Sequence, residues 1–436
     1  MMFSRIIGNQ DFKTKILLLI LLLIGFQQFP VIYVGGSLKV YEVLGLILLV
    51  LYGIKRRKSL FVSSVYIFFV VSPIVSLVAF YFLDDVGSYY RTYPSASNTF
   101  RFNIYVFPIL QLLFMFANYV VLYNLYYNKE IYKRFDVVLK GIVIMGTIIA
   151  CYSIIAMFIG DPISRLPNFI QNKHVYEFRS SGLSQEPSNY ILYQGWIIIF
   201  CWLLKDSISK CKWLIIVTIN IASILLTFSS SLAMYVGIIA LVVFAFSKLY
   251  LKIIYIASFL VILFIGYSVL TKYVDSEMIN YALVQKVEDF VFGKEDAGGS
   301  GGFRHYESSL GWIIFQENPI LGVGVGNSNY FMHVAEKKSP VIPLDEQLNE
   351  TSFPPNTFSC VFAEQGIVGG GVFVIMIVIA LINVWKYRKC QYGKFFLCGT
   401  LFNIATFLVI APVYSMYLWT YLFMVLGYIR YVQSNE

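Results

Sequence analysis

The sequence predicts an all-α polytopic membrane protein with about 12 transmembrane helices and a long extracytoplasmic loop that contains short amphipathic helices. Three observations carry this prediction. Hydrophobic residues make up 58% of the chain and charged residues 13%, whereas a globular protein has about 25% charged residues. The hydrophobic residues gather in long apolar runs, and short basic loops separate the runs. We therefore expect residues 1–436 to form a single integral membrane domain rather than several soluble domains.

The apolar runs give the predicted spans and their direction through the membrane. In chain order the predicted spans are 14–34, 38–54, 60–83, 101–127, 137–160, 189–204, 213–228, 231–247, 253–271, 356–385, 395–411 and 413–430. If the N-terminus is cytoplasmic, 21 of the 33 Lys and Arg lie on the cytoplasmic side and 12 are spread over the longer outside segments. The positive-inside rule expects this bias, so both termini are predicted to be cytoplasmic.

Charge and cysteine usage exclude several kinds of partner. The net charge is +9, but most of the basic residues lie in short loops between spans, so we expect membrane lipid and no nucleic acid as a partner. All six cysteines fall within predicted spans or on the cytoplasmic side. The outside segments therefore offer no disulfide and no cysteine-based metal site, and we expect neither a metal nor another cofactor.

Three outside segments are longer than a turn, and function is most plausibly sought there. They are 84–100, an extracytoplasmic loop at 161–188, and a large extracytoplasmic loop at 272–355. In the large loop, residues 276–292 carry apolar side chains at helical spacing, which indicates an amphipathic helix on the membrane or over a cavity. A second helix is expected over 303–317, because Asn318 and Pro319 would stop it.

The motif RSSGLSQEPSNY occupies residues 179–190, where the second outside segment enters a span. Arg179 is suited to hold an anionic phosphate through a two-pronged contact. Glu186 is a carboxylate at the membrane edge, and Ser188 or Asn189 is predicted to cap the following helix. The alternative interpretation is that Arg179 and Glu186 only solvate the end of the span.

The large loop carries a second group of candidates. Arg304 and Trp312 are about two helical turns apart and so lie roughly on one face, and His305 is next to Arg304. Trp312 is alternatively an interfacial anchor. The following run PILGVGVGN at 319–327 has the glycines of a phosphate-binding loop but not the lysine of a nucleotide site, so tight backbone packing is the favoured interpretation.

Two further groups lie at the ends of spans. Glu364 is the acid placed deep in an apolar run, and such a carboxylate should face a polar cavity or a partner. The alternative role for Glu364 is a structural hydrogen bond to a neighbouring helix. The run TFSSSLA at 227–233 is a tight outside turn of hydroxyl groups, and an ordinary helical hairpin explains it best.

In their order and spacing these pieces resemble the superfamily of O-antigen polymerases and O-antigen ligases of the bacterial cell envelope. The resemblance extends over roughly residues 175–375. The matching residues are Arg179, Gly182, EPSN at 186–189, TFSSS at 227–231, Arg304, Trp312, PILGVGVGN at 319–327, Asn356, Glu364, Gln365, Gly366 and GG at 369–370.

The resemblance implies an enzyme of the bacterial cytoplasmic membrane that acts on its outer face. Members of this superfamily are glycosyltransferases that use sugars carried by undecaprenyl pyrophosphate, so the expected substrate is an oligosaccharide on that lipid and the expected chemistry needs no metal. The leaving pyrophosphate gains negative charge, which Arg179 and Arg304 are placed to stabilise. The general base is expected among Glu186, His305 and Glu364. Asn189, Trp312, Asn356 and Ser230 are the expected substrate-binding residues.

The polymerase branch fits the motifs best. Ligases carry a histidine beside the asparagine that opens the span with Glu364, and this chain has Pro354 and Pro355 there. The resemblance therefore implies a polymerase that joins repeat units into O-antigen or capsular polysaccharide, with a chain-length regulator protein as a partner. Two alternatives remain, an O-antigen ligase and a flippase or other transporter of lipid-linked oligosaccharide. A transporter would more often show charges deep in several spans and two related halves.

Overall fold

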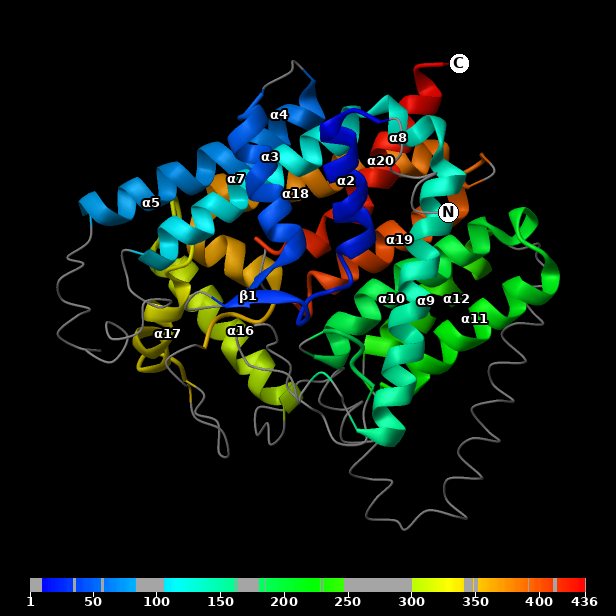
Figure 1. Cartoon of the computed structure of the whole chain (residues 1–436). Helices are drawn as coiled ribbons and strands as arrows, with labels where there is room; N and C mark the ends of the chain where they lie inside the picture. The colour runs from blue at the N-terminus through cyan, green and yellow to red at the C-terminus, as the bar shows by residue number, and fades with distance from the viewer. Residues whose placement is uncertain are drawn as a thin grey trace, which may run out of the picture.

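The chain forms a bundle of helices in the computed structural model (Figure 1). The structure describes residues 10–33, 37–55, 59–83, 106–160, 163, 180–184, 186–227, 229, 231–246, 300–340, 348, 352–390, 392–410 and 414–435. The predicted span 253–271, the predicted amphipathic helix 276–292 and the outside segment 84–100 lie outside the described residues.

Helices account for most of the described residues. The α-helices are α2 Phe12–Leu23, α3 Val40–Tyr52, α4 Leu60–Tyr66, α5 Ser72–Leu83, α7 Val106–Tyr127, α8 Lys129–Lys133, α9 Phe135–Ile159, α10 Pro187–Leu203, α11 Lys210–Leu225, α12 Ser231–Phe246, α16 Ser300–Glu317, α17 Ser328–Glu336, α18 Thr357–Tyr387, α19 Gly393–Thr406 and α20 Thr420–Gln433. A π-helical turn, η1 Ile67–Val71, joins α4 to α5, and the short helices η5 Lys205–Ser207 and η7 Met416–Leu418 precede α11 and α20. The two strands are β1 Val31–Tyr33 and β2 Ser37–Lys39.

Helices occupy most of each predicted span that the structure describes. Within the described parts of the chain, four continuous helical stretches are long and apolar enough to cross a membrane, namely Leu60–Phe82, Val106–Tyr127, Phe135–Ile159 and Thr357–Tyr387. The helical class is therefore confirmed, and the number of 12 spans stays a prediction. In the large loop, α16 ends at Glu317 as the Asn318-Pro319 stop predicts, and α17 adds a short helix after the glycine run.

The first predicted span, 14–34, is shorter than expected, and a short pair of strands follows it within the helical chain. Helix α2 ends at Leu23, and an antiparallel hairpin of β1 and β2 follows, with Val31 paired to Lys39. Pro30 has no N–H to continue a helix, and the β-branched Val31 and Ile32 favour an extended chain. The apolar run at 14–34 therefore contains non-helical and extended backbone after Leu23, which its hydropathy does not reveal.

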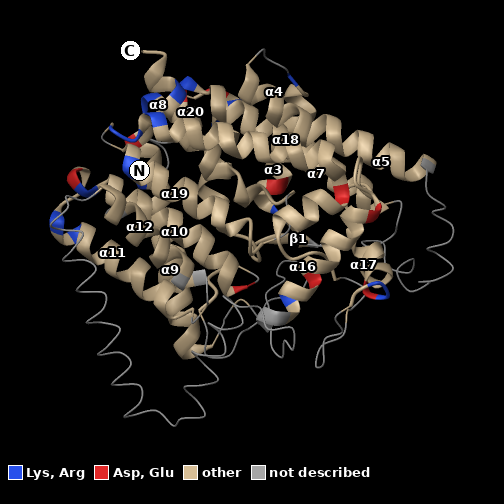
Figure 2. Ribbon diagram, turned by 180° about the vertical axis from the view of Figure 1, so that it is seen from behind, with Lys and Arg blue, Asp and Glu red and all other residues tan. Residues whose placement is uncertain are grey.

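The two ends of the bundle differ in charge. Helix α2 begins and α20 ends at one end, which we call the terminus end, and most Lys and Arg gather there (Figure 2). Cations at this end lie over aromatic rings of neighbouring helices, such as Lys13 over Tyr52 and Arg430 over Tyr127. Helices α16 and α17 lie at the opposite end, which we call the hairpin end because β1 and β2 lie there too. This asymmetry is the one that the positive-inside rule expects.

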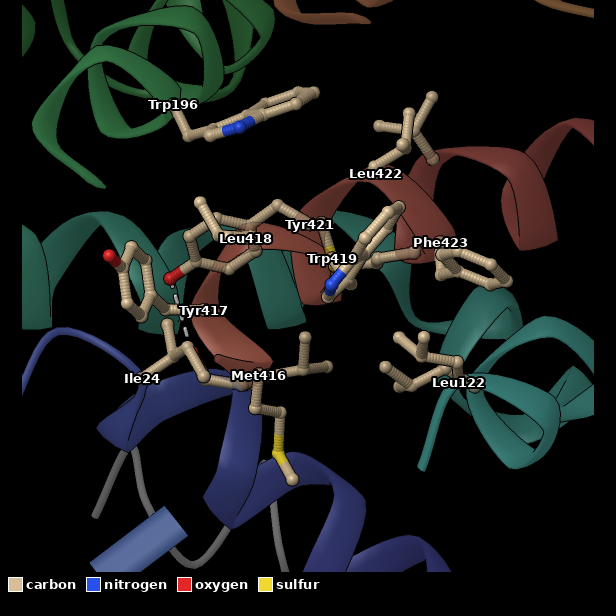
Figure 3. Close-up of a cluster of buried hydrophobic side chains, with 14 of the residues drawn as sticks. Ile24, Leu122, Trp196, Met416, Tyr417, Leu418, Trp419, Tyr421, Leu422 and Phe423 are labelled. Carbon is tan, nitrogen blue, oxygen red and sulfur yellow. Dashed lines mark hydrogen bonds between the residues drawn. The ribbon is translucent and has the colours of Figure 1, made fainter. Parts of the chain in front are cut away.

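The core surrounds helix α10 and the segment that opens α20. Trp196 of α10 and Trp419 are both almost completely buried, and Figure 3 shows Trp196, Leu122 and Ile24 around the labelled side chains of Met416–Phe423. The hydroxyl of Tyr421 donates to the carbonyl of Leu21 at 3.3 Å. Segments from three distant parts of the chain thus fix η7, and with it Tyr417, near the hairpin end.

Candidate functional site

The glycine run after α16 lies against a break in the long helix α18. Gly366 has φ +59° and ψ −161° in the middle of α18, so the helix loses its hydrogen-bond pattern there. The backbone N–H groups of Val323 and Gly324 donate to the carbonyls of Ala363 and Glu364 at 3.0 and 2.9 Å. In return, the N–H groups after the break donate to the loop, Ile367 to Pro319 at 2.8 Å and Val368 to Ile320 at 3.3 Å.

This exchange explains why both segments are rich in glycine. Gly322, Gly324 and Gly326 all have positive φ, a conformation that residues with a Cβ adopt at a cost. A Cβ on Gly366 would overlap the Ile320 carbonyl and lie 2.6 Å from the Leu321 nitrogen. Irregular backbone inside a membrane bundle is tolerated only where its polar groups are satisfied by protein. The structure therefore confirms tight backbone packing as the role of the glycine run.

Glu364 lies beneath this crossing and is buried, with 3% of its surface exposed. The hydroxyl of Ser328 donates to its Oε1 at 2.8 Å, and the backbone of Gly326 and Ser328 and the thiol of Cys360 interact with the same carboxyl group. These partners bind the loop and α17 to α18. The geometry favours the structural interpretation of Glu364 over a role at an open site.

A different carboxylate meets Arg304. The guanidinium Nη2 of Arg304, near the start of α16, lies 2.9 Å from Oε2 of Glu186, the residue that precedes α10. The hydroxyl of Ser188 donates to the same oxygen at 3.2 Å. The Arg304 and Glu186 side chains are 41% and 39% exposed. An ion pair this accessible contributes about 0–1 kcal/mol to stability, so an anionic ligand can open it at little cost.

Helix α16 is held in place through its other side. Leu310 and Ile314 are buried against α17 and α5, and the Tyr306 hydroxyl donates to Oε1 of Glu336 at 3.5 Å. Burial, together with the nearby Glu336 carboxylate, raises the pKa of Tyr306 to about 12. Tyr306 thus stays protonated at neutral pH and keeps its hydrogen bond to α17.

The remaining predicted residues are spread around this centre. His305 is exposed and Asn189 is half-buried in the first turn of α10, where Glu186, and not Ser188 or Asn189, occupies the capping position. Trp312 is 39% exposed and packs on Phe362 with ring centres 5.4 Å apart. The position of Trp312 fits an interfacial anchor.

Asn356 has a structural task of its own. Its side chain accepts a hydrogen bond from the backbone N–H of Ser359 at 2.7 Å, and this bond caps the start of α18. A substrate would have to compete with that cap. Arg179 and Ser230 lie outside the described residues, so their predicted roles remain predictions.

Three residues near the ion pair were missed by the sequence interpretation. Lys39 Nζ lies 3.1 Å from Glu42 Oε1 at the start of α3. Tyr417 of η7 lies near both Glu42 and Glu186, whose negative charges disfavour its ionised form, so one tyrosine lies near a glutamate of each ion pair. A lysine three residues before a glutamate is common at helix starts, and no signal in the sequence sets this pair apart.

The described part of the chain contains no group of three or more His, Cys, Asp or Glu side chains placed to hold a metal ion. The arrangement instead offers a guanidinium for an anion and a carboxylate for a proton, both reachable from solvent.

Part of the chain is similar to a known protein family. The family model described as O-antigen ligase matches residues 215–374, a stretch that contains Arg304, Trp312, Asn356, Glu364 and the glycine crossing. Glu186 and Lys39 lie outside the matched stretch. A search of curated proteins found no match.

Proposed function

We propose that this chain is a polymerase of lipid-linked repeat units, because its residues 215–374 match the family model described as O-antigen ligase. The substrate is an oligosaccharide on undecaprenyl pyrophosphate, and the product is O-antigen or capsular polysaccharide. The reaction takes place on the outer face of the bacterial cytoplasmic membrane, with both termini in the cytoplasm and a chain-length regulator protein as a partner. The hairpin end of the bundle then faces outward.

The observation that carries this proposal is the ion pair of Arg304 and Glu186. Glycosyl transfer from a lipid pyrophosphate breaks the bond between the sugar and a phosphate oxygen, so negative charge grows on the leaving group. A guanidinium can stabilise that charge through two parallel hydrogen bonds. The attacking sugar hydroxyl must lose a proton, and a carboxylate within reach can accept it. The pair supplies both groups at one place.

Glu186 is the best general base among the three candidates. Glu364 is buried beneath the glycine crossing and is engaged by Ser328. His305 is exposed on α16 but does not share the contact with Arg304. Glu186 is joined directly to the cation that would bind the donor. A pyrophosphate competes with Glu186 for the guanidinium, so donor binding releases the carboxylate to accept the acceptor's proton.

The residue at the position where ligases carry a histidine supports the polymerase over the ligase. Pro354 is buried, and a Cβ on Gly311 of α16 would lie 2.9 Å from the Pro354 ring. This position is therefore used to pack α16 against the start of α18 and offers no group that titrates. The ligase remains the second candidate, because the matching family model is described as O-antigen ligase.

The two candidates, and a flippase, are separated by where glycan accumulates in a deletion strain. The polymerase predicts loss of long chains while single repeat units still reach their acceptor. Long polymer that stays on the lipid carrier would instead indicate a ligase, and repeat units trapped on the inner leaflet would indicate a flippase. Complementation with Glu186→Gln tests the base, since the amide keeps the shape of the side chain but cannot accept the proton. Normal chain length in that variant would remove Glu186 from the mechanism.

A further inference from the structure

A second cation lies at the hairpin end, and the proposed function has not used it. The Lys39 ammonium is 3.1 Å from Glu42 Oε1, while the backbone N–H of Lys39 donates to Glu42 Oε2 at 3.0 Å. The Lys39 and Glu42 side chains are 19% and 10% exposed, so the pair is more enclosed than the pair of Arg304 and Glu186. Glu42 is held by the backbone at the start of α3, and its carboxylate therefore fixes where the ammonium lies.

Backbone contacts join the segments that lead to the two ion pairs. The backbone N–H groups of Gln27 and Gln28, just before the hairpin, donate to the carbonyl of Leu183 at 3.2 and 2.9 Å. Leu183 belongs to the segment that leads into Glu186. Tyr417 lies near both Glu42 and Glu186, whose negative charges disfavour its ionised form. The hairpin, the segment before α10 and η7 thus form one polar wall.

This wall contains polar atoms that have no hydrogen-bond partner among the residues that the structure describes. They are Nε2 of Gln27, Oε1 of Gln28 and Oγ of Ser184, and the three side chains are at most 2% exposed. Buried polar atoms without partners are rare in folded proteins and call for water or a ligand. Their place beside the two ion pairs points to a polar ligand at this end of the bundle.

We propose that Lys39 is a second phosphate-binding cation of this site and that Glu42 positions it. The inference rests on the proposed function, because a pyrophosphate carries two phosphates and the site then offers one cation to each. Arg304 would bind one phosphate through its planar fork, and Lys39 would bind the other as a mobile point charge. Each cation is paired with a glutamate in the free protein, so neither charge is buried alone before the donor arrives.

The test is direct binding of geranylgeranyl pyrophosphate to the purified full-length protein in detergent. Geranylgeraniol, which has the same chain and no phosphate, measures the contribution of the lipid tail. Lys39→Ala should weaken binding of the pyrophosphate by about 10-fold or more, the effect of losing one hydrogen bond to a charged group. Binding of geranylgeraniol should not change.

Lys133→Ala is the matched control. Lys133 also pairs with a glutamate at the same spacing, with its Nζ 2.6 Å from Glu130, but this pair lies in α8 at the terminus end. The variant removes an equal charge and an ion pair of the same sequence spacing at the other end of the bundle, so it should leave binding of the pyrophosphate unchanged. An equal loss in Lys39→Ala and Lys133→Ala would reduce the effect to net charge and overturn the proposal.

Glu42→Gln separates anion binding from a purely structural role. Glutamine can still accept the backbone hydrogen bond from Lys39, but it leaves the ammonium without a counter-charge. If Lys39 binds phosphate, this variant should bind the pyrophosphate as tightly as the wild type or more tightly. If the pair only caps α3, both variants should lower the thermal stability together and binding should follow stability, which would overturn the proposal. Lys39→Gln replaces Lys39→Ala if the alanine variant does not fold.

The outcome also separates this inference from the proposed function. If Arg304→Ala abolishes binding of geranylgeranyl pyrophosphate while Lys39→Ala and Lys39→Gln bind it normally, the role of Lys39 is wrong and the proposed function stands. If the wild type shows no preference for the pyrophosphate over geranylgeraniol, the proposed function fails and the role of Lys39 fails with it.

Discussion

Replacing Gly366 with alanine should disrupt the crossing between the glycine run and α18. Gly366 has φ +59° and ψ −161°, a backbone region used almost only by glycine, and an L-residue there costs about 1–3 kcal/mol. The added Cβ would also overlap the Ile320 carbonyl and lie 2.6 Å from the Leu321 nitrogen. These are backbone atoms, so the loop must move away from the helix rather than rotate a side chain.

That movement would break the reciprocal hydrogen bonds between residues 319–324 and 363–368. Their four N–H···O distances are between 2.8 and 3.3 Å, and each bond contributes about 0.5–1.5 kcal/mol. With the backbone strain, the expected loss is about 3–9 kcal/mol. Folded proteins have a total stability of about 5–15 kcal/mol, so Gly366→Ala is expected to be poorly folded or barely stable.

The assay is the apparent Tm of purified protein, read as the fraction that stays monodisperse after heating in detergent. Gly366→Ala should lower it by at least about 5 °C. Gly371→Ala is the control in the same helix, because no heavy atom lies within 4 Å of its added Cβ. Alanine in a regular helix is better than glycine by up to about 1 kcal/mol, so this variant should match or exceed the wild type. Equal Tm values for the two variants would refute the crossing.

The other predictions concern the site and the orientation. Arg304→Lys and Arg179→Lys should each leave mainly unpolymerised repeat units at normal protein level, since losing a two-pronged contact to developing charge costs about 10²-fold in rate; near-normal chain length in both would contradict the pyrophosphate role. Activity should persist in EDTA, and a loss that Mg²⁺ or Mn²⁺ restores in a purified assay would show that a metal takes part. Reporter fusions at about residues 92, 172 and 300 should read outside and those at about 57, 131 and 390 inside; a cytoplasmic signal at 300 would place Arg304 on the wrong side for the substrate.

Hydropathy alone predicted most of the helices, because a long apolar run in lipid has almost no alternative to a helix. It failed between Leu23 and Lys39, where the run contains Pro30 and β-branched residues and turns into a hairpin. Apolar content is the same for a span and for a buried hairpin, so composition could not tell them apart.

The site was predictable in its parts but not in its pairing. Arg304, Glu186 and Glu364 were all identified from their motifs. Nothing in the sequence indicates that Arg304 contacts Glu186, which is 118 residues away, or that Glu364 contacts Ser328. Such pairings follow from how the helices pack. Lys39 and Tyr417 were not identified from the sequence, because each lies in a part of the chain that has no recognisable motif.

The crossing at Gly366 attaches the C-terminal end of α16 to α18. This end is fixed to the broken helix by the bonds of residues 319–324, while Arg304 lies 14 residues before Asn318, about 20 Å along the axis. If the axis of α16 tilted by about 10° about its C-terminal end, Arg304 would move by about 3–4 Å, more than the length of a hydrogen bond. Because Leu310 and Ile314 are buried against neighbouring helices and Gly311 packs against Pro354, such a tilt would also have to shift these contacts. The packing along α16, together with the crossing, therefore sets the position of the guanidinium relative to Glu186.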